Sequence, residues 1–391
     1  IHMKSTKALY YHLTTEKEFK HRYPHFNLND KKVHILFLMA CTNEQGYYRM
    51  ILPAMELNRT ATHAAIIGQI HKWNFNKQFD DYDIAIDFRL VEWADYIVVP
   101  ALFSDINYII KSMREINSDV EFVMDIDLNY HQLPPDHPDF KKFTPELKQI
   151  LQANLSQIDI LSAPNNYLLS AYEKLAQESE EELSLYFERY GNLLSNFTYE
   201  EIQHIQRNNG QKIRIGLIVD ASQGNDVKLL EKVIATLLEK HPDKIEIILF
   251  GWSKKVAMQN GLFDKLNITY ENPVPFQEFH SRLNSLTLDI GLLPFVNNAY
   301  NVSGKTLTRY LDFSGNMIPV VASEMLPFTK VIEDGDNGFL AGKDEEWVAK
   351  IEQLILNAEL RTAIGKSAFN TAWAKFSYTP QSIERLKNIF I

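Results

Sequence analysis

Residues 33–39 read Val33-His34-Ile35-Leu36-Phe37-Leu38-Met39, a short and almost continuous apolar run. Runs of this kind are typical of β-strands that are covered on both faces, as strands are in a parallel sheet. Residues 40–46 form a polar stretch, and residues 47–57 then carry apolar side chains at helical spacing. The sequence therefore predicts a strand, a loop and a helix in that order, which is the repeating unit of an α/β fold.

Similar units follow along the first half of the chain. Short apolar runs that predict strands alternate with segments of helical spacing, and this alternation favours a parallel sheet with right-handed crossovers. The predicted strands are residues 64–67, 96–99, 120–124 and 158–161, and the predicted helices are residues 106–116 and 145–153.

A second series of the same kind begins near residue 213. Residues 206–212 are polar throughout and are the best candidate for a linker, because a new strand pattern follows directly at residues 213–219. Asn225 or Asp226 is then expected to cap a helix whose apolar residues recur every three to four positions up to Leu238. The remaining pattern predicts strands at residues 245–250, 288–293 and 318–322, and helices at residues 276–286 and 305–313.

We therefore predict an α/β protein of two Rossmann-like domains, since 391 residues exceed what one hydrophobic core usually organises. The expected divisions are an amino-terminal extension over residues 1–30, a first domain over residues 31–208, a second domain over residues 209–375 and a closing helix within residues 376–391.

Composition limits the location and the partners of the chain. The formal net charge of −10 argues against nucleic-acid binding, which needs basic surface to displace phosphate counterions. Cys41 is the only cysteine, so an internal disulfide and a cysteine-cluster zinc site are excluded, and a reducing compartment is favoured. No apolar run reaches the roughly 20 residues that span a bilayer. We expect a cytoplasmic protein, and peripheral association with the membrane and homo-oligomerisation stay open.

Ligands of open parallel sheets bind at the carboxyl ends of the strands, so the loops that follow the apolar runs are the places to look for function. The first is residues 43–49, where Gly46 allows close approach of a ligand to the backbone and the next helix offers amide groups to an anion. Arg49 adds a positive charge there. The alternative is a tight turn followed by a surface arginine.

The second loop, residues 124–131, carries two aspartates and a histidine at the end of a strand. Asp125, Asp127 and His131 are suited to binding sugar hydroxyls, to orienting an acceptor or to holding a divalent cation, although the pattern for a metal is weak. The alternative is an aspartate that caps a turn and a histidine packed against Tyr130.

The third loop, residues 298–312, combines a glycine, cations and a carboxylate. Gly304 relaxes the turn, and Lys305 and Thr306 are expected to open a helix whose amino end binds phosphate. Arg309 and Asp312 lie on the same helical face, where the carboxylate is suited to chelating the hydroxyls of a ribose. The alternative for this pair is an ion pair within the helix without a ligand.

Several segments resemble the retaining, family-four type of GT-B glycosyltransferases, which are also called glycosyl transferases group 1. The similarity is ordered and spans most of the chain. It is carried in the second half by residues 289–295, 301–312, 316–323 and 334–341, and in the first half by residues 46–57 and 125–129 with the following Leu-Pro-Pro.

The resemblance implies two Rossmann-like domains that face a central cleft, with the closing helix returning to the first domain. It also implies a UDP- or GDP-sugar donor and transfer of a hexose-type unit, with retention, to a growing glycan, a lipid-linked sugar or a protein. No cofactor and no obligatory metal are expected. A polysaccharide biosynthesis enzyme fits this description.

The resemblance also assigns roles to single residues. Lys305 would meet the diphosphate with Gly304, Thr306 and Arg309 beside it, and Asp312 would meet the ribose. The nucleobase would lie at residues 272–276, which include Val274. Gly46 and Arg49 would approach the phosphates from the opposite domain, and Asp127 or His131 would assist the reacting sugar.

The chain departs from the family pattern at its two glutamates. When Asp312 is aligned with the second glutamate, Gly304 stands in the place of the first. This departure keeps an alternative open, namely a catalytically weak GT-B subunit that binds a glycan or a partner glycosyltransferase. An epimerase on the same fold is a third alternative, which the lysine at residue 305 disfavours.

Overall fold

The computed structural model describes residues 6–16, 18–39, 41–68, 87–177, 186–196, 198, 207–210, 212–220 and 222–391. The chain divides into two units, and it passes between them more than once. The first unit comprises Ile1–Gln132, Lys142–Ser195 and Tyr378–Ile391, and the second comprises Leu133–Lys141 and Asn196–Ser377.

A parallel sheet of six strands forms the centre of the first unit, in the order β2-β1-β3-β4-β5-β6. The five strands predicted from the apolar runs of this half are confirmed within a few residues. The edge strand β6 was not predicted. The strands are β1 (Val33–Phe37), β2 (His63–Ile67), β3 (Tyr96–Pro100), β4 (Glu121–Asp125), β5 (Ile160–Ala163) and β6 (Tyr186–Arg189).

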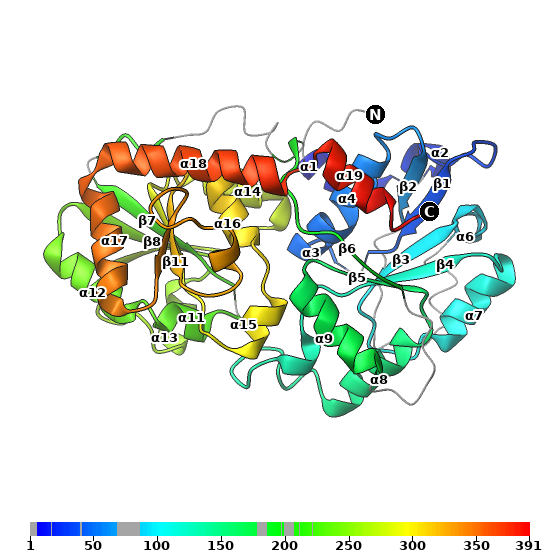
Figure 1. Ribbon diagram of the computed structural model, residues 1–391, viewed down its shortest axis with the longest axis horizontal. Helices are drawn as coiled ribbons and strands as arrows, with labels where there is room; N and C mark the ends of the chain where they lie inside the picture. Colours follow the sequence, from blue (N-terminus) through cyan, green and yellow to red (C-terminus); the bar gives the residue numbers. More distant parts are fainter. Residues whose placement is uncertain are drawn as a thin grey trace. The chain divides into compact units, whose positions relative to one another are not determined.

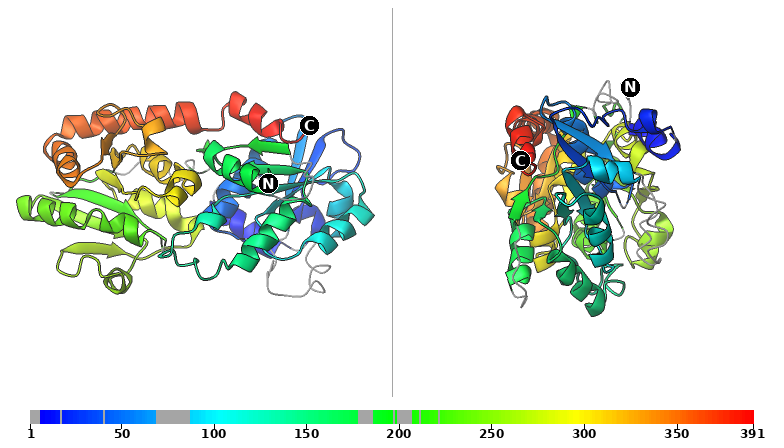
Figure 2. Two further views of the ribbon diagram at one scale, coloured as in Figure 1. Left: turned by 60° about the horizontal axis from the view of Figure 1, so that its bottom comes forward. Right: turned by 90° about the vertical axis from the view of Figure 1, so that its right-hand side faces the viewer.

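Helices lie on both faces of this sheet (Figures 1 and 2). They are α1 (Thr6–Thr15), α2 (Phe19–Arg22), α3 (Glu44–Gly46), the π-helical turn η1 (Tyr47–Ile51), α4 (Leu52–Leu57), α6 (Phe88–Trp93), α7 (Asn107–Ile116), the 3-10 turn η3 (Tyr130–Gln132), α8 (Pro145–Leu155), α9 (Asn166–Gln177) and α19 (Pro380–Lys387).

The last helix, α19, belongs to the first unit although it follows the whole second unit in sequence. It packs against α4, and the red and blue helices lie side by side in Figure 1. Behind it, the Phe390 carbonyl oxygen lies 3.1 Å from Nε2 of His63, and the Tyr96 hydroxyl donates to the carbonyl oxygen of Ile391 at 2.7 Å. The residues after Tyr378 are therefore tied to β2 and β3.

The second unit contains another six-stranded parallel sheet, in the order β12-β11-β10-β7-β8-β9. The four strands predicted from the apolar runs of this half are confirmed, whereas β9 was not predicted. The strands are β7 (Ile213–Ile218), β8 (Ile245–Phe250), β9 (Ile268–Glu271), β10 (Ile290–Leu293), β11 (Val320–Ser323) and β12 (Phe339–Ala341).

Helices also cover both faces of the second sheet (Figures 1 and 2). They are α11 (Gly224–Lys228), α12 (Glu231–Lys240), α13 (Lys254–Gln259), α14 (Phe276–Ser285), α15 (Ala299–Gly304), α16 (Thr308–Gly315), the 3-10 turn η4 (Phe328–Lys330), α17 (Asp344–Leu356) and α18 (Ala358–Phe376). Each unit thus has the doubly wound α/β architecture that the sequence predicts, and the fold class is confirmed.

One glycine sets how closely α16 lies on this sheet. Gly291 is in the buried strand β10, and a Cβ atom added there would lie 2.7 Å from the ring of Phe313. Because glycine has no side chain, the ring packs directly on the strand. This contact fixes α16, and with it the segment just before the helix, against the end of β10.

Two details of the second unit differ from the sequence prediction. The helix expected to begin at Lys305 begins at Thr308, and Lys305 is instead the residue that ends α15. The helix expected from Asn225 to Leu238 is two helices, α11 and α12, and neither Asn225 nor Asp226 caps it, because residue Gln223 precedes α11 without a side-chain cap. The Asp226 side chain has another partner, described below.

Candidate functional site

The carboxyl ends of the second sheet gather most of the predicted donor-binding residues at one edge. Asp220 and Ser222 follow β7, residues 272–275 follow β9, and Phe295 follows β10. Since all six strands are parallel, their carboxyl ends share this edge. All three loops therefore lie at the edge where ligands of parallel sheets bind.

Lys305 lies in the short connection between α15 and α16, on this edge. Its ammonium group donates to Oγ of Ser222 at 3.3 Å, and it lies 5.5 Å from the ring centre of Tyr300 and 5.8 Å from that of Phe295. The neighbouring Thr306 shares a 2.7 Å hydrogen bond with the hydroxyl of Thr308. A half-buried cation thus stands directly before the amino end of α16, which is a favourable place for a phosphate.

Asp220 brings a carboxylate to the same place. Although burial opposes the effect, Lys305 and Arg309 lower the pKa of Asp220 below its usual range, and Ser222 donates a hydrogen bond to the carboxylate. Asp220 as a whole residue is exposed to solvent. Asp220 therefore offsets part of the positive charge that Lys305 offers to a diphosphate.

Arg309 and Asp312 form the ion pair that the sequence offered as the alternative to ribose binding. The Arg309 guanidinium donates to Oδ2 of Asp312 at 2.9 Å, and the Asp312 side chain is only 1% exposed. The ribose role of Asp312 stays a prediction. It requires the ribose to reach a carboxylate that already has a cation beside it.

The other two predicted donor residues occupy different parts of this edge. Gly304 is buried as the last residue of α15, immediately before Lys305. Val274 is half-buried in the connection between β9 and α14, whose neighbours Asn272 and Pro273 are exposed. That connection has the exposure a nucleobase site needs, and the assignment stays a prediction.

Asp226, which the sequence suggested as a helix cap, instead holds the loop that leads to Lys305. Its Oδ1 atom accepts hydrogen bonds from the amide of Val296 at 2.8 Å and from Nδ2 of Asn301 at 2.9 Å. The Asn301 side chain also donates to the carbonyl oxygen of Val296 at 2.8 Å. Burial raises the pKa of Asp226, and these hydrogen bonds oppose the rise. These hydrogen bonds to the buried Asp226 therefore hold the start of the 298–312 loop in place.

The first unit brings Asp127 and His131 together through two tyrosines. Oδ1 of Asp127 accepts a hydrogen bond from the Tyr130 hydroxyl at 2.7 Å, and the amide of Tyr130 donates to the Tyr172 hydroxyl at 3.1 Å. That hydroxyl lies 3.3 Å from Nδ1 of His131. Among the described residues, Oδ2 of Asp127 and Nε2 of His131 are buried without a hydrogen-bond partner. Buried polar atoms of this kind are usually satisfied, so two in one loop are a candidate site for a hydroxylated ligand.

The protonation of these two side chains is set by their surroundings. Burial, aided by the negative charge of Asp125, raises the pKa of Asp127 to about 6 against the hydrogen bond from Tyr130. Burial lowers the pKa of His131, and a backbone hydrogen bond with Lys148 opposes the change. At neutral pH the loop therefore presents a carboxylate and a neutral imidazole.

Arg49 is buried and fully engaged. Its guanidinium donates to both carboxylate oxygens of Asp125, at 2.7 and 2.6 Å, and to the carbonyl oxygen of Tyr190 at 2.6 Å. Ser162 also donates to Asp125, and the Arg49 and Asp125 side chains are 3% and 1% exposed. Although burial opposes it, Asp125 raises the pKa of Arg49. The surface arginine of the sequence alternative is therefore wrong, and a direct contact of Arg49 with the phosphates stays a prediction that requires this pair to open.

Gly46 is needed for a close approach within the chain itself. A Cβ atom at this position would lie 2.0 Å from the carbonyl oxygen of Cys41. The helix also begins earlier than expected, at Glu44, with Asn43 as its cap, and Gly46 is buried in its first turn before the π-helical turn. The approach of a phosphate to Gly46 stays a prediction, while the glycine has a sufficient structural reason.

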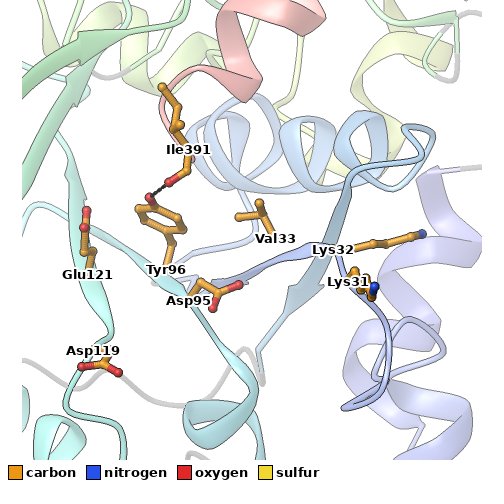
Figure 3. A pocket seen from close by; sticks show the side chains of 8 residues that line it. All are labelled: Lys31, Lys32, Val33, Asp95, Tyr96, Asp119, Glu121 and Ile391. Carbon is orange, nitrogen blue, oxygen red and sulfur yellow. Dashed lines mark hydrogen bonds between the residues drawn. The ribbon is translucent and has the colours of Figure 1, made fainter.

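A cavity of about 310 Å³ lies at the amino ends of the strands of the first sheet (Figure 3). Val33, Tyr96 and Glu121, which line it, are the first residues of β1, β3 and β4. Figure 3 shows the Tyr96 hydroxyl bonded to Ile391 at its rim. None of the predicted site residues lines this cavity.

Two further kinds of feature are absent from the described part of the chain. There, no three or more histidine, cysteine, aspartate and glutamate side chains are placed to hold a metal ion together. Likewise, no helix of that part has the length and apolar character that a bilayer crossing requires. Transfer without a metal stays a prediction.

Solved structures provide the comparison that decides the fold. Sucrose-phosphate synthase from Thermosynechococcus elongatus matches with a TM-score of 0.58 and 11% identity, over 92% of this chain and 98% of that one. HepE from Anabaena, solved with UDP-glucose, matches with a TM-score of 0.55 and 12% identity, over 91% and 98%.

The chain has the GT-B fold. TarM matches as well, with a TM-score of 0.51 and 16% identity over 78% of this chain, and the chain spans 58% of the length of TarM. No model of a protein family and no curated protein matches the sequence. The resemblance to GT-B proteins that the sequence suggested is thus confirmed at the level of the fold.

Within this GT-B chain, the sequence prediction missed four residues that shape the two candidate sites. Asp220 directly follows a predicted strand, so the rule applied to the other loops identifies it. Tyr172, His137 and Tyr300 gave no such signal, because each meets its partner across a long separation in sequence, such as the 163 residues between His137 and Tyr300.

Proposed function

We propose that this protein is a glycosyltransferase that moves a hexose-type sugar from a UDP- or GDP-sugar to a hydroxyl group of a glycan, a lipid-linked or a protein acceptor, with retention of configuration. The observation that carries the proposal is Lys305, which stands beside Ser222 before the amino end of α16. HepE, which has the same fold and was solved with UDP-glucose, supports it.

The second unit would bind the donor. When the sugar leaves, the nucleoside diphosphate gains negative charge, and fixed positive charge stabilises that transition state. The Lys305 ammonium and the first amides of α16 offer such charge at the carboxyl ends of the strands. Val274 and the exposed residues beside it are suited to the nucleobase.

The first unit would act on the reacting sugar. As the bond from the anomeric carbon to the diphosphate breaks, positive charge develops on the sugar, and the acceptor oxygen then bonds to that carbon while its proton passes to the departing phosphate. The Asp127 carboxylate would stabilise this charge. His131 would bind a sugar hydroxyl through Nε2.

A second candidate function is a GT-B subunit that binds a glycan or a partner glycosyltransferase with little activity of its own. It is favoured by two carboxylates at the proposed donor site, which lower the positive charge offered to a diphosphate: Asp220 lies beside Lys305, and Asp312 is paired with Arg309. Transfer and hydrolysis assays over a panel of nucleotide sugars, with binding measured by calorimetry, separate the two functions. Binding without turnover of any donor would favour the subunit.

Replacement of Lys305 with alanine is expected to weaken the binding of UDP or GDP by about 10- to 150-fold, because a charge-assisted contact to phosphate contributes roughly 1.5–3 kcal/mol. Isothermal titration with the nucleotide measures the change. Lys244→Ala is the matched control, since Lys244 is exposed just before β8, at the other edge of the sheet. Equal affinities of the Lys305 and Lys244 variants would remove Lys305 from the site.

Replacement of Asp220 with asparagine is expected to strengthen nucleotide binding, the opposite of the effect expected for Lys305→Ala. The variant loses a negative charge beside Lys305, so UDP should bind up to about five-fold more tightly, in keeping with exposed charge interactions of roughly 0.2–1 kcal/mol. The gain should shrink in concentrated salt, which screens exposed charges. Weaker binding by Asp220→Asn would instead mean that the carboxylate helps to hold the ligand.

A further inference from the structure

The segment Leu133–Lys141 belongs to the second unit although residues of the first unit precede and follow it. Prolines at positions 134, 135 and 138 restrict its backbone. The amide of His137 donates to the carbonyl oxygen of Pro134 at 2.9 Å, and Nδ2 of Asn225 donates to Asp136 at 2.5 Å. The segment is therefore a stiff loop that the chain contributes to the second unit.

His137 is the buried centre of this segment, with 6% of its surface exposed. Its Nδ1 atom accepts a hydrogen bond from the amide of Asp139 at 3.1 Å. Since Nδ1 is an acceptor, the ring hydrogen of the neutral imidazole is on Nε2. Nε2 lies 3.5 Å from the Tyr300 hydroxyl, and the two rings meet edge to face with centroids 5.5 Å apart.

Burial favours the neutral form of the His137 ring. Burial and Lys305 lower its pKa, while Asp139, Asp220 and Asp136 oppose the change. His137 is thus a neutral hydrogen-bond donor at neutral pH, aimed at Tyr300. Tyr300 is in turn the ring over which the Lys305 ammonium lies at 5.5 Å.

We infer that His137 is a positioning residue of the nucleoside-diphosphate site, and this inference rests on the proposed function. Its Nε2–H group holds the Tyr300 hydroxyl, and the fixed ring keeps Lys305 directed toward Ser222 and the diphosphate. Because His137 follows His131 by six residues, the same segment connects donor binding to the loop that carries Asp127 and His131. We expect donor binding to order both loops, which hydrogen exchange can test.

Two substitutions of His137 distinguish the role of Nδ1 from that of Nε2. His137→Asn keeps an acceptor near the place of Nδ1 and loses the donor toward Tyr300, whereas His137→Gln keeps a donor near the place of Nε2. We expect His137→Asn to weaken UDP binding by about three- to ten-fold, as the loss of a single hydrogen bond does, and His137→Gln to stay within about two-fold. Tyr300→Phe removes only the hydroxyl and should match His137→Asn, and the double variant should be no weaker than either single one.

Calorimetry with UDP on the full chain and hydrogen exchange with and without UDP test the inference. UDP should slow exchange at residues 126–141 in the unaltered protein and much less in His137→Asn, an effect that a merely structural histidine does not produce. The control is His241→Asn, because His241 lies after α12 at the opposite edge of the second sheet.

The outcomes are distinguishable from a failure of the proposed function. If the unaltered protein binds UDP and both His137→Asn and Tyr300→Phe bind it equally well, the inference is overturned and the proposed function stands. Slowed exchange confined to residues 212–391 would also overturn it. If the unaltered protein binds neither UDP nor GDP, the proposed function falls, and the inference falls with it.

Discussion

Replacement of Arg49 with alanine is expected to lower the free energy of unfolding of the first unit by about 3–5 kcal/mol, because it leaves the buried carboxylate of Asp125 without its cation. The two side chains are 3% and 1% exposed and joined by two hydrogen bonds. Calorimetric unfolding of the variant and the unaltered chain measures the loss.

The chain offers a matched control for Arg49 at its surface. Arg89 binds both carboxylate oxygens of Asp87, at 2.9 and 2.6 Å, but its side chain is 59% exposed. Arg89→Ala should therefore cost about 0–1 kcal/mol. Substituting Arg49 and Asp125 together by Met and Leu should restore much of the stability that Arg49→Ala loses. Equal losses for Arg49→Ala and Arg89→Ala would contradict the buried pair.

Replacement of Asp127 with asparagine is expected to lower sugar transfer by about 100-fold or more, since under the proposed function it removes the negative charge that would stabilise the developing positive charge of the sugar. UDP affinity should be unchanged. The rate of the unaltered protein should fall as the pH drops through about 6, where Asp127 gains a proton, and the residual rate of the variant should lack this step. Equal transfer rates for both proteins would exclude Asp127 from catalysis.

The same substitution should raise the free energy of unfolding by an amount that depends on pH. The folded state raises the pKa of Asp127 to about 6, so ionisation of this group opposes folding above the pKa of the unfolded chain. Asp127→Asn should therefore stabilise the protein at pH 7.5 by up to about 3 kcal/mol, and the gain should vanish near pH 4. The exposed Asp119→Asn serves as the control in the same unfolding measurements.

The strands were predictable because their signal is local. The run Ile213–Ile218 is apolar apart from Arg214 near its start, and burial on both faces of a central strand favours such a run. The edge strand β9 is half-buried throughout, so it has no such run, and it was missed. The start of α16 was expected at Lys305 and lies at Thr308, and the contact that positions this helix joins Gly291 and Phe313, which lie in different elements.

The candidate sites were predictable in their loops and less so in their contacts. Lys305, Asp127 and His131 follow predicted strands, which is why the sequence located them. That Arg49 is committed to Asp125, 76 residues away, depends on the tertiary fold. Charge and spacing show which residue types are present at a strand end, and packing decides which of them already have partners.

The return of the chain to the first unit has a consequence for its synthesis. Residues 378–391 leave the ribosome after the whole of Asn196–Ser377, yet the first unit contains them, with Phe390 buried and its ring 6.3 Å from that of Phe37. Domains generally fold in the order of their synthesis. In this chain, the surface of the first unit that α19 covers therefore stays exposed while the second unit is translated. We therefore expect ribosome-bound chains stalled before residue 378 to bind chaperones through the surface of α4 and β2.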